Sequence, residues 1–458
     1  MNFWQRNYAK SKMTKEDEIG VMTKSLSMSN RRVLIVSYHF PPRPSIAALR
    51  IRGLAKYLPE HGWVPVILTA AYSSDSESPF NVVQTHYPGD AMSSLKRKIF
   101  LTPDKGFQEQ IGLPRAWRGA KGKEGIVSKI IKHVKSIIAY PDDEKGWYPF
   151  AVSEADNLIK NGQFDALISS AAPYTCHLIA KTLKSGHDLP WIADFRDLWT
   201  QNHYYSYGLL RHFFEKKLEL KTLSLADALV TVSDPLAQKL ESLHKDKRVV
   251  TITNGFDSDD VATLPLTKEF SITYTGQIYT GKQDPKLLFQ AISELIVEGS
   301  IAESQIRVRF LGGSPYWLEQ EVKKYNLARI VEIQPRAPRD IALSMQRESH
   351  VLLLLNWSDP AELGVYTGKI FEYLAAQKPI LAVGGPGGVV AELLNHTGVG
   401  VHVASLDKLK VLLGSWYQEY ITKGRVTYCG NWDEVKKFSH REMARKFAEL
   451  LNNVTRRL

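Results

Sequence analysis

Residues 368–383 read GKIFEYLAAQKPILAV, and this stretch indicates the fold more directly than any other part of the chain. It predicts a glycine turn, a short helix and then a buried strand that ends in the glycine-rich segment 384–388. A short helix that leads directly into an apolar strand is a repeating unit of α/β sheets. We therefore expect this part of the chain to belong to a parallel sheet.

The same stretch carries a chemical signal. Lys369 and Glu372 are three residues apart, so the helix presents a cation and a carboxylate on one face. The start of the helix at Thr367 and Gly368 offers free N–H groups and a positive dipole end, which suit phosphate. The carboxylate suits two ribose hydroxyls, so the pair indicates a nucleoside diphosphate. The alternative is a surface ion pair on an ordinary connection.

Apolar runs of strand length recur on both sides of this stretch and alternate with helical patterns. This rhythm predicts an α/β fold with two tandem, doubly wound Rossmann-like domains, and their ligand sites would face each other across an interdomain cleft. The expected strands of the first domain are 31–37, 64–69, 165–169, 191–194, 228–232 and 249–252, and those of the second are 272–274, 306–311, 331–333, 351–355, 379–383 and 400–403.

These patterns divide the chain into segments. Residues 1–29 lack an apolar core and are expected to form a disordered tail, neither signal peptide nor anchor. The predicted segments that follow are a first domain over 30–257, a polar linker over 258–268, a second domain over 269–430 and a terminal segment over 431–458. Ser439 and Glu442 form a capping box, which predicts the start of a last amphipathic helix.

Composition restricts the class of protein. The chain has 458 residues, 44% hydrophobic and 23% charged, and no run long enough to span a membrane. Only Cys176 and Cys429 are present, which fits a reducing compartment with neither a disulfide framework nor a metal site.

The net charge of +11 is concentrated in one insertion. Residues 94–140 contain eleven Lys/Arg and three acidic residues. Within this insertion, residues 126–139 place isoleucines and valines on one side of a helix and lysines on the other. Two interpretations remain open: a helix that packs on its own domain, or one that lies on an anionic membrane surface. Nucleic-acid binding is not expected, because few aromatic residues interleave with the charge.

Polar residues follow three expected strands of the first domain and would meet at one edge of its sheet. Asp194, Arg196 and Asp197 could position or deprotonate an acceptor hydroxyl, and His39 is another candidate base. The alternative is structural, with Asp197 capping a helix and Arg196 as its ion-pair partner.

In the second domain, Gly276 and Gln277 follow a strand, and Lys282 comes soon after them. The glycine allows the backbone to approach a ligand, and the lysine can reach phosphate. Arg336 follows the next-but-one strand, where backbone groups could hold a flat base. No metal-binding constellation and no nucleophile elbow occurs, so no metal is expected.

Several motifs together resemble the retaining family 4 (group 1) glycosyltransferases, in particular the bacterial branch that builds O-antigen, capsule and exopolysaccharide. The resemblance covers residues from about 31 to the terminal helix. The motifs are YHFPP (38–42), DFRDLW (194–199), NGFD (254–257), TYTGQIY (273–279) and TGKIFEYLAAQKPILAV (367–383).

The resemblance implies a GT-B fold whose last helix crosses back to the first domain. It also implies metal-independent, retaining transfer from a UDP- or GDP-linked sugar, without a cofactor. The acceptor would be a lipid-linked saccharide, and the enzyme would be cytoplasmic at the inner face of the membrane. Glu372 matches the family's ribose ligand, and Lys282 and Lys369 match its diphosphate ligands.

The sequence also departs from the family pattern. Gly364 stands where the family has its first glutamate, with Glu362 nearby, and Gln277 replaces a common arginine. Arg43 and the three residues after it replace a common glycine pair. Two other functions therefore remain open. The protein could be a nucleotide-sugar 2-epimerase of the same fold, or a non-catalytic assembly subunit that binds a nucleotide-sugar.

Overall fold

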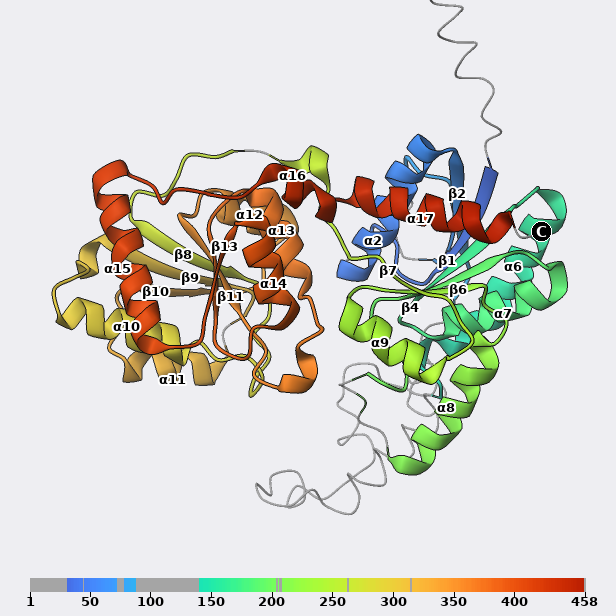
Figure 1. The fold of residues 1–458 in the computed structure, drawn as a ribbon, viewed down its shortest axis with the longest axis horizontal. Helices are drawn as coiled ribbons and strands as arrows, with labels where there is room; N and C mark the ends of the chain where they lie inside the picture. The colour runs from blue at the N-terminus through green and yellow to red at the C-terminus, as the bar shows by residue number, and fades with distance from the viewer. Residues whose placement is uncertain are drawn as a thin grey trace, which may run out of the picture.

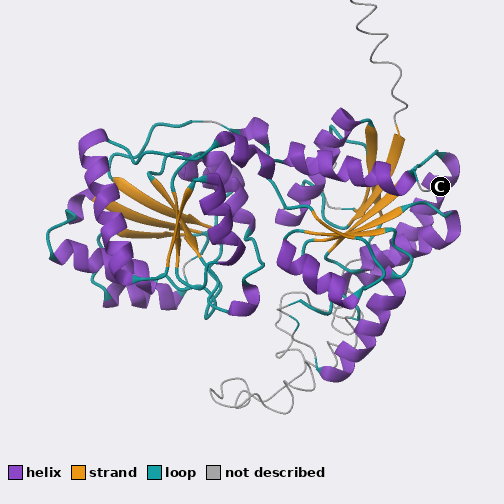
Figure 2. Ribbon diagram, in the orientation of Figure 1, coloured by secondary structure: helices purple, strands orange, loops and turns teal. Residues whose placement is uncertain are grey.

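The structure is a computed structural model that describes residues 31–456 except 44, 72–77, 88–139, 203–204, 206–207, 262 and 314. The described residues form two parallel sheets, each with helices on its faces (Figures 1 and 2). The predicted tail 1–29, residues 94–139 of the basic insertion and its amphipathic stretch 126–139 all lie outside the described residues.

The first domain contains a seven-stranded sheet with the order β3-β2-β1-β4-β5-β6-β7. Its strands are β1 (Arg31–Ser37), β2 (Trp63–Ala70), β3 (Val82–Thr85), β4 (Ala166–Ala171), β5 (Trp191–Phe195), β6 (Ala228–Thr231) and β7 (Val249–Thr251). Its helices are α2 (Ile46–Tyr57), η1 (Leu58–His61), η3 (Asp143–Trp147), α6 (Tyr148–Asn161), α7 (Thr175–His187), α8 (Leu209–Leu223) and α9 (Asp234–Leu243).

The second domain contains a six-stranded sheet with the order β10-β9-β8-β11-β12-β13. Its strands are β8 (Phe270–Thr275), β9 (Ile306–Leu311), β10 (Val331–Gln334), β11 (Val351–Leu355), β12 (Ile380–Val383) and β13 (Gly400–Val403). Its helices and the short elements that flank it are η4 (Ser258–Asp260), α10 (Lys286–Val297), η5 (Glu303–Gln305), α11 (Tyr316–Lys324), α12 (Arg339–Arg347), η6 (Pro360–Glu362), α13 (Gly368–Ala376), α14 (Gly388–Thr397), α15 (Leu406–Lys423), α16 (Trp432–Val435) and η7 (Lys436–Phe438).

The predicted fold class is confirmed. Each expected strand is present to within two residues, because strands buried on both faces are continuous apolar runs that are easily recognised. The strand β3 was not predicted: it has only four residues, and Val82 and Val83 are its only apolar ones. β3 is a strand because it pairs with β2, and its own sequence pattern does not indicate one.

The last helix, α17 (His440–Thr455), crosses back to the first domain and lies along α2 (Figure 1). Ser439 caps it by accepting a hydrogen bond from the Glu442 backbone N–H at 3.2 Å. Met443 and Phe447 are buried in the same core as Ile35 of β1. A Cβ at Gly53 would lie 2.6 Å from His440, so α2 and α17 pack closely only because residue 53 is glycine.

The chain crosses between the two domains at two adjacent segments. The Phe256 backbone N–H donates to the Phe438 carbonyl at 3.1 Å, and the His440 N–H donates to the Phe256 carbonyl at 2.7 Å. A Cβ at Gly255 would come within 2.7 Å of Ser439 backbone. The two segments that cross between the domains are therefore hydrogen-bonded to each other, next to the start of α17.

Candidate active site

The second domain builds a cradle where β8 and β11 end, at the point where its strand order reverses. Gly276 follows β8 with φ of 101°, a conformation that favours glycine. A Cβ at Gly312 would lie 2.4 Å from the Gly276 carbonyl oxygen, so the loops after β8 and β9 touch. Together, these two glycine-containing loops expose main-chain atoms at the edge of the sheet.

Lys369, the second residue of α13, lies against this cradle. Its Nζ donates to the hydroxyl of Tyr274 and lies 3.8 Å from the centre of that ring. A Cβ at Gly276 would lie 3.5 Å from Lys369 Cε, which is ordinary van der Waals contact. Burial lowers the pKa of Lys369 to about 7, against the opposing effect of Glu372. An added anion would favour its charged form.

The N-terminus of α13 adds to the positive potential here. Its N-cap residue, Thr367, makes no side-chain capping bond, and its buried Oγ1 has no hydrogen-bond partner among the described residues. The first turn of α13 carries no acidic side chain, so no charge of its own offsets the positive end of its dipole.

Lys282 is engaged by a buried carboxylate. Its Nζ donates to Glu362 Oε1 at 2.6 Å, and Glu362 is only 2% exposed. The other oxygen, Oε2, has no hydrogen-bond partner in the described part of the chain. A buried carboxylate oxygen without a partner is costly, which makes it a candidate contact for a ligand hydroxyl.

Gly364 lies in the contact between the two domains. Its carbonyl accepts a hydrogen bond from Ser233 Oγ at 2.6 Å, and a Cβ at this position would lie 2.9 Å from Pro235 Cβ of α9. A glutamate at 364 would therefore disturb the contact. This packing is a physical reason why the carboxylate nearest this position is Glu362.

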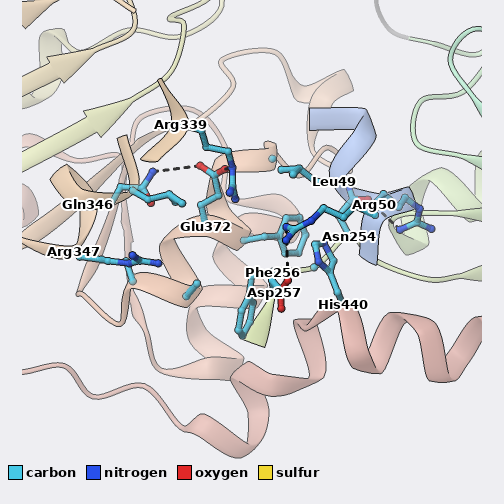
Figure 3. Close-up of a pocket in the computed structure, with 17 residues that line it drawn as sticks. Leu49, Arg50, Asn254, Phe256, Asp257, Arg339, Gln346, Arg347, Glu372 and His440 are labelled. Carbon is cyan, nitrogen blue, oxygen red and sulfur yellow. Dashed lines mark hydrogen bonds and ion pairs between the residues drawn. The ribbon is translucent and has the colours of Figure 1, made fainter. Parts of the chain in front are cut away.

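Glu372 faces a small cavity of about 40 Å³ between the domains (Figure 3). Its Oε1 accepts from Arg339 Nε at 3.1 Å and its Oε2 from Gln346 Nε2 at 3.3 Å. Gln346 also donates to Thr275 Oγ1 at the end of β8, at 2.8 Å. On the other side of the cavity lie Asn254 and residues of α2 and α17. Glu372 is thus held in place beside the cradle.

In the first domain, Asp194 does not occupy a position suited to a base. Arg50, also buried, donates to it through Nε at 3.0 Å and Nη2 at 2.8 Å, and Ser170 Oγ donates at 2.8 Å. Arg50 further donates to the Ile252 and Thr253 carbonyls. Asp194 therefore neutralises a buried arginine that ties α2 to the chain leaving β7.

The other predicted residues of this domain are Arg196, Asp197 and His39. Arg196 is held by two carbonyls, with Nε 2.8 Å from Ala171 O and Nη2 2.6 Å from Ala172 O. Its neighbour Asp197 is exposed. Burial, with the charges of Arg196 and Arg43, lowers the pKa of His39 to about 4, so His39 is neutral at pH 7. Its Nδ1 is buried without a hydrogen-bond partner in the described chain.

A second cavity, of about 230 Å³, lies between the domains next to these residues. Arg196 and Asp197 contribute from the loop after β5, and Tyr366 and Gly368 contribute from the start of α13. The remaining lining residues are Ala47, Leu198, Gln201, Asn202, Val232, Leu236, Asn254 and Val365. Gly368 and Asn254 border both cavities, so the α13 cradle and the first-domain loops face one continuous region.

The sequence model of Glycosyltransferase Family 4 matches residues 47–260, most of the first domain. The chain contains a Glycosyltransferase Family 4 domain.

Solved structures match nearly the whole chain. Sucrose-phosphate synthase from Thermosynechococcus elongatus has a TM-score of 0.58 at 13% identity and covers 93% of this chain and 100% of its own. The α,α-trehalose 6-phosphate synthase from Burkholderia multivorans gives 0.57 at 12%, covering 93% and 99%. Anabaena Alr3699/HepE, in complex with UDP and glucose, gives 0.54 at 12%, covering 92% and 99%. No curated protein matches the sequence. These likenesses establish the GT-B fold.

Four of the predicted residues, Arg196, Asp197, Gly368 and Glu372, line the two cavities between the domains. Lys369, Gly276, Gly368 and Thr367 adjoin each other, and Glu372 is one helical turn further along α13. Gln277 is exposed beside the cradle and its carbonyl accepts from Tyr274 Oη at 2.9 Å. Arg336 is exposed beyond β10.

Sequence reasoning missed three contributors. Arg50 is one residue of an ordinary amphipathic helix pattern, and Tyr274 is an ordinary strand residue, so neither gave a signal. Tyr366 lines the larger cavity immediately before the glycine turn at 368, and that adjacency could have identified it.

Among the described residues, no helix has the length and apolarity needed to cross a membrane.

Proposed function

We propose that this protein is a glycosyltransferase that moves a sugar from a nucleotide-sugar to a hydroxyl of a saccharide acceptor. One observation carries the proposal: Lys369 lies at the N-terminus of α13, beside Gly276, where the strand order of the second sheet reverses. Backbone, cation and helix dipole there suit a diphosphate. The Family 4 domain match supports the reaction class.

In the proposed reaction, the bond between the anomeric carbon and the diphosphate oxygen breaks, the acceptor oxygen bonds to that carbon, and the proton of the acceptor hydroxyl passes to an oxygen of the departing diphosphate. Negative charge then grows on the departing diphosphate. The Lys369 ammonium and the α13 N–H groups stabilise that charge, which makes a metal ion unnecessary in this proposal. Retention of configuration is part of the proposal because the sequence resembles retaining enzymes.

UDP-linked sugars are the first donors to test and GDP-linked sugars the second. Structures of Anabaena Alr3699/HepE have been solved with UDP and with UDP-glucose, and this chain shares their fold. The proposed acceptor is a lipid-linked saccharide of bacterial surface polysaccharide assembly, received at the 230 Å³ cavity beside Arg196 and Asp197. This role places the enzyme in the cytoplasm, at the inner face of the membrane.

A turnover assay tests the proposal. Purified full-length protein is incubated with UDP- and GDP-sugars and a lipid-linked saccharide extract, and nucleotide release is measured together with the mass of the glycan. We expect release coupled to a gain of one sugar. Release with an epimeric free sugar and no glycan product would instead support the 2-epimerase alternative. Binding without turnover would support the non-catalytic subunit.

Replacing Glu372 by Ala is expected to weaken UDP binding about tenfold to a hundredfold, because a charged hydrogen-bond acceptor for ribose is lost. Calorimetry with UDP and 2′-deoxy-UDP checks this assignment. The wild type should discriminate between the two ligands, and Glu372→Ala should not. Equal preference for the ribose form in both proteins would contradict the ribose role, and an unchanged melting temperature would exclude misfolding.

Replacing Glu362 by Gln is expected to weaken nucleotide-sugar binding about tenfold while leaving UDP affinity nearly unchanged. The reason is that its unpartnered Oε2 is proposed to accept a hydroxyl of the donor sugar. Titration of both ligands against both proteins separates two explanations. A parallel loss of UDP affinity would show that Glu362 acts only by holding Lys282.

The affinity for UDP is expected to fall as pH rises above 7. Lys369 has a pKa of about 7 without ligand, so above this pH binding must take up a proton. The dissociation constant should rise up to about tenfold per pH unit until the pKa of the bound form is reached. Lys369→Arg, which stays charged, should bind with little pH dependence over this range. A pH-independent wild type would contradict the assignment.

A further inference from the structure

Helix α8 exposes apolar side chains to solvent. Its outer face carries two leucines in the first turn and two phenylalanines in the second: Leu209 is 90% exposed, Leu210 73%, Phe213 52% and Phe214 52%. Leu220, further along the same face, is 38% exposed. A helix of a globular domain normally turns such residues inward. Here the apolar surface is unpartnered within the described chain.

The inner face of α8 carries the carboxylates. Glu215 is buried and accepts from Arg211 Nε at 2.6 Å. Glu219 is fully buried and accepts from the Thr200 N–H at 3.1 Å and from His244 at 3.3 Å. These hydrogen bonds of the buried carboxylates fix which face of α8 is turned toward its own domain. The outward apolar face is therefore a feature of the fold.

The charge on the outer face is positive. Lys216, Lys217 and Lys221 are all exposed, and Lys217 Nζ lies 4.3 Å from the centre of the Phe213 ring. Both acidic residues of α8 point inward, so no carboxylate of this helix offsets these lysines. Helices that lie in an anionic lipid interface have this kind of surface, with leucine and phenylalanine next to lysine and no acidic residues.

The helix is also joined to the larger cavity. His212 Nε2 lies 3.1 Å from the Thr200 carbonyl, and the loop residues Leu198, Gln201 and Asn202 beside it line that cavity. In Figure 1, α8 projects from the first domain on the side away from α17. A surface bound by α8 would therefore lie near the cavity and far from the paired crossing of the two domains.

We propose that the outer face of α8 is a membrane-docking surface, in which Leu209, Leu210, Phe213 and Phe214 insert among anionic lipids and the three lysines contact their headgroups. A second copy of the chain is a poorer occupant of this surface. In a two-fold contact the lysines of one copy would face the same lysines of the other copy, and these like charges would repel. The link to a lipid-linked acceptor rests on the proposed function, whereas the docking surface itself rests on α8 alone.

Co-sedimentation of the full chain with vesicles of equal parts phosphatidylglycerol and phosphatidylcholine tests the proposal. We expect binding that weakens in pure phosphatidylcholine and in high salt. Phe213→Ser/Phe214→Ser and Lys216→Glu/Lys217→Glu should each lower the partition coefficient at least tenfold. The matched control is Val411→Ser, since this exposed valine of α15 lies in the other domain; it should bind like the wild type.

Unchanged vesicle binding of both α8 variants would overturn the proposal, as would no binding of the wild type. A dimer in solution that Phe213→Ser/Phe214→Ser dissolves would instead make the face an interface between copies. UDP binding is measured in parallel. If UDP binding is intact while vesicle binding is absent, docking fails and the proposed donor site stands. The reverse result would reject the donor site and keep the docking surface.

Discussion

Replacing Lys369 by Met is expected to lower kcat/KM for the donor about a hundredfold to a thousandfold, the size of effect seen when one preorganised stabiliser of a departing charge is removed. The thioether chain of methionine is long enough to fill the space over the Tyr274 ring, where Lys369 Nζ now lies. The charge that would face the diphosphate is absent. Steady-state nucleotide release from the donor measures the effect.

The folded state should tolerate this change. Because burial lowers the pKa of Lys369, the empty protein holds the charged form at a cost, and methionine removes that cost. We expect a melting temperature equal to or above that of the wild type. Lys369→Arg is the companion variant and should retain part of the activity. Normal turnover by Lys369→Met would remove the lysine from the mechanism.

Replacing Arg50 by Leu is expected to lower the free energy of unfolding by about 3–5 kcal/mol, because it leaves the Asp194 carboxylate buried without its counter-charge. Arg50 also supplies hydrogen bonds to Thr253 O at 2.9 Å and Asn254 Oδ1 at 3.1 Å. Urea denaturation followed by tryptophan fluorescence measures the loss, since Trp63, Trp147, Trp191 and Trp199 are all buried in this domain.

Arg52 provides the matched control on the same helix. Its side chain is 34% exposed and lies 3.8 Å from Asp257, so Arg52→Leu should cost at most about 1 kcal/mol. In the double variant Arg50→Leu/Asp194→Leu, part of the stability should return, because no unpaired charge remains. If Asp194→Asn kept full stability but lost activity, Asp194 would be catalytic and our structural assignment wrong.

The fold was predictable because it depends on strong, local patterns. The apolar runs around Leu353 and Leu381 have no polar alternation, and the turn at Gly276 ends its strand clearly. The second-domain cradle was predictable for a related reason: Lys369 and Glu372 share one helix with the glycine turn, so their proximity needs no tertiary information.

The first-domain site was less predictable because it depends on long-range pairing. The sequence places Asp194 at the end of a strand, where a catalytic base would also lie, and only the structure brings Arg50 from 144 positions away to meet it. Likewise, the partner of Lys282 is Glu362, 80 positions later in the chain. The inward carboxylates of α8 were hidden for the same reason, since a helical pattern alone does not say which face is covered.

The second domain is proposed to bind a nucleoside diphosphate without a metal ion. The most direct measurement is the melting temperature of the purified full chain with UDP, GDP, CMP and dTDP, in EDTA and in Mg²⁺. We expect a rise of several degrees with one nucleoside diphosphate, equal in both buffers and absent from Lys369→Met. No rise with any nucleotide, or a rise that requires the divalent cation, would contradict it.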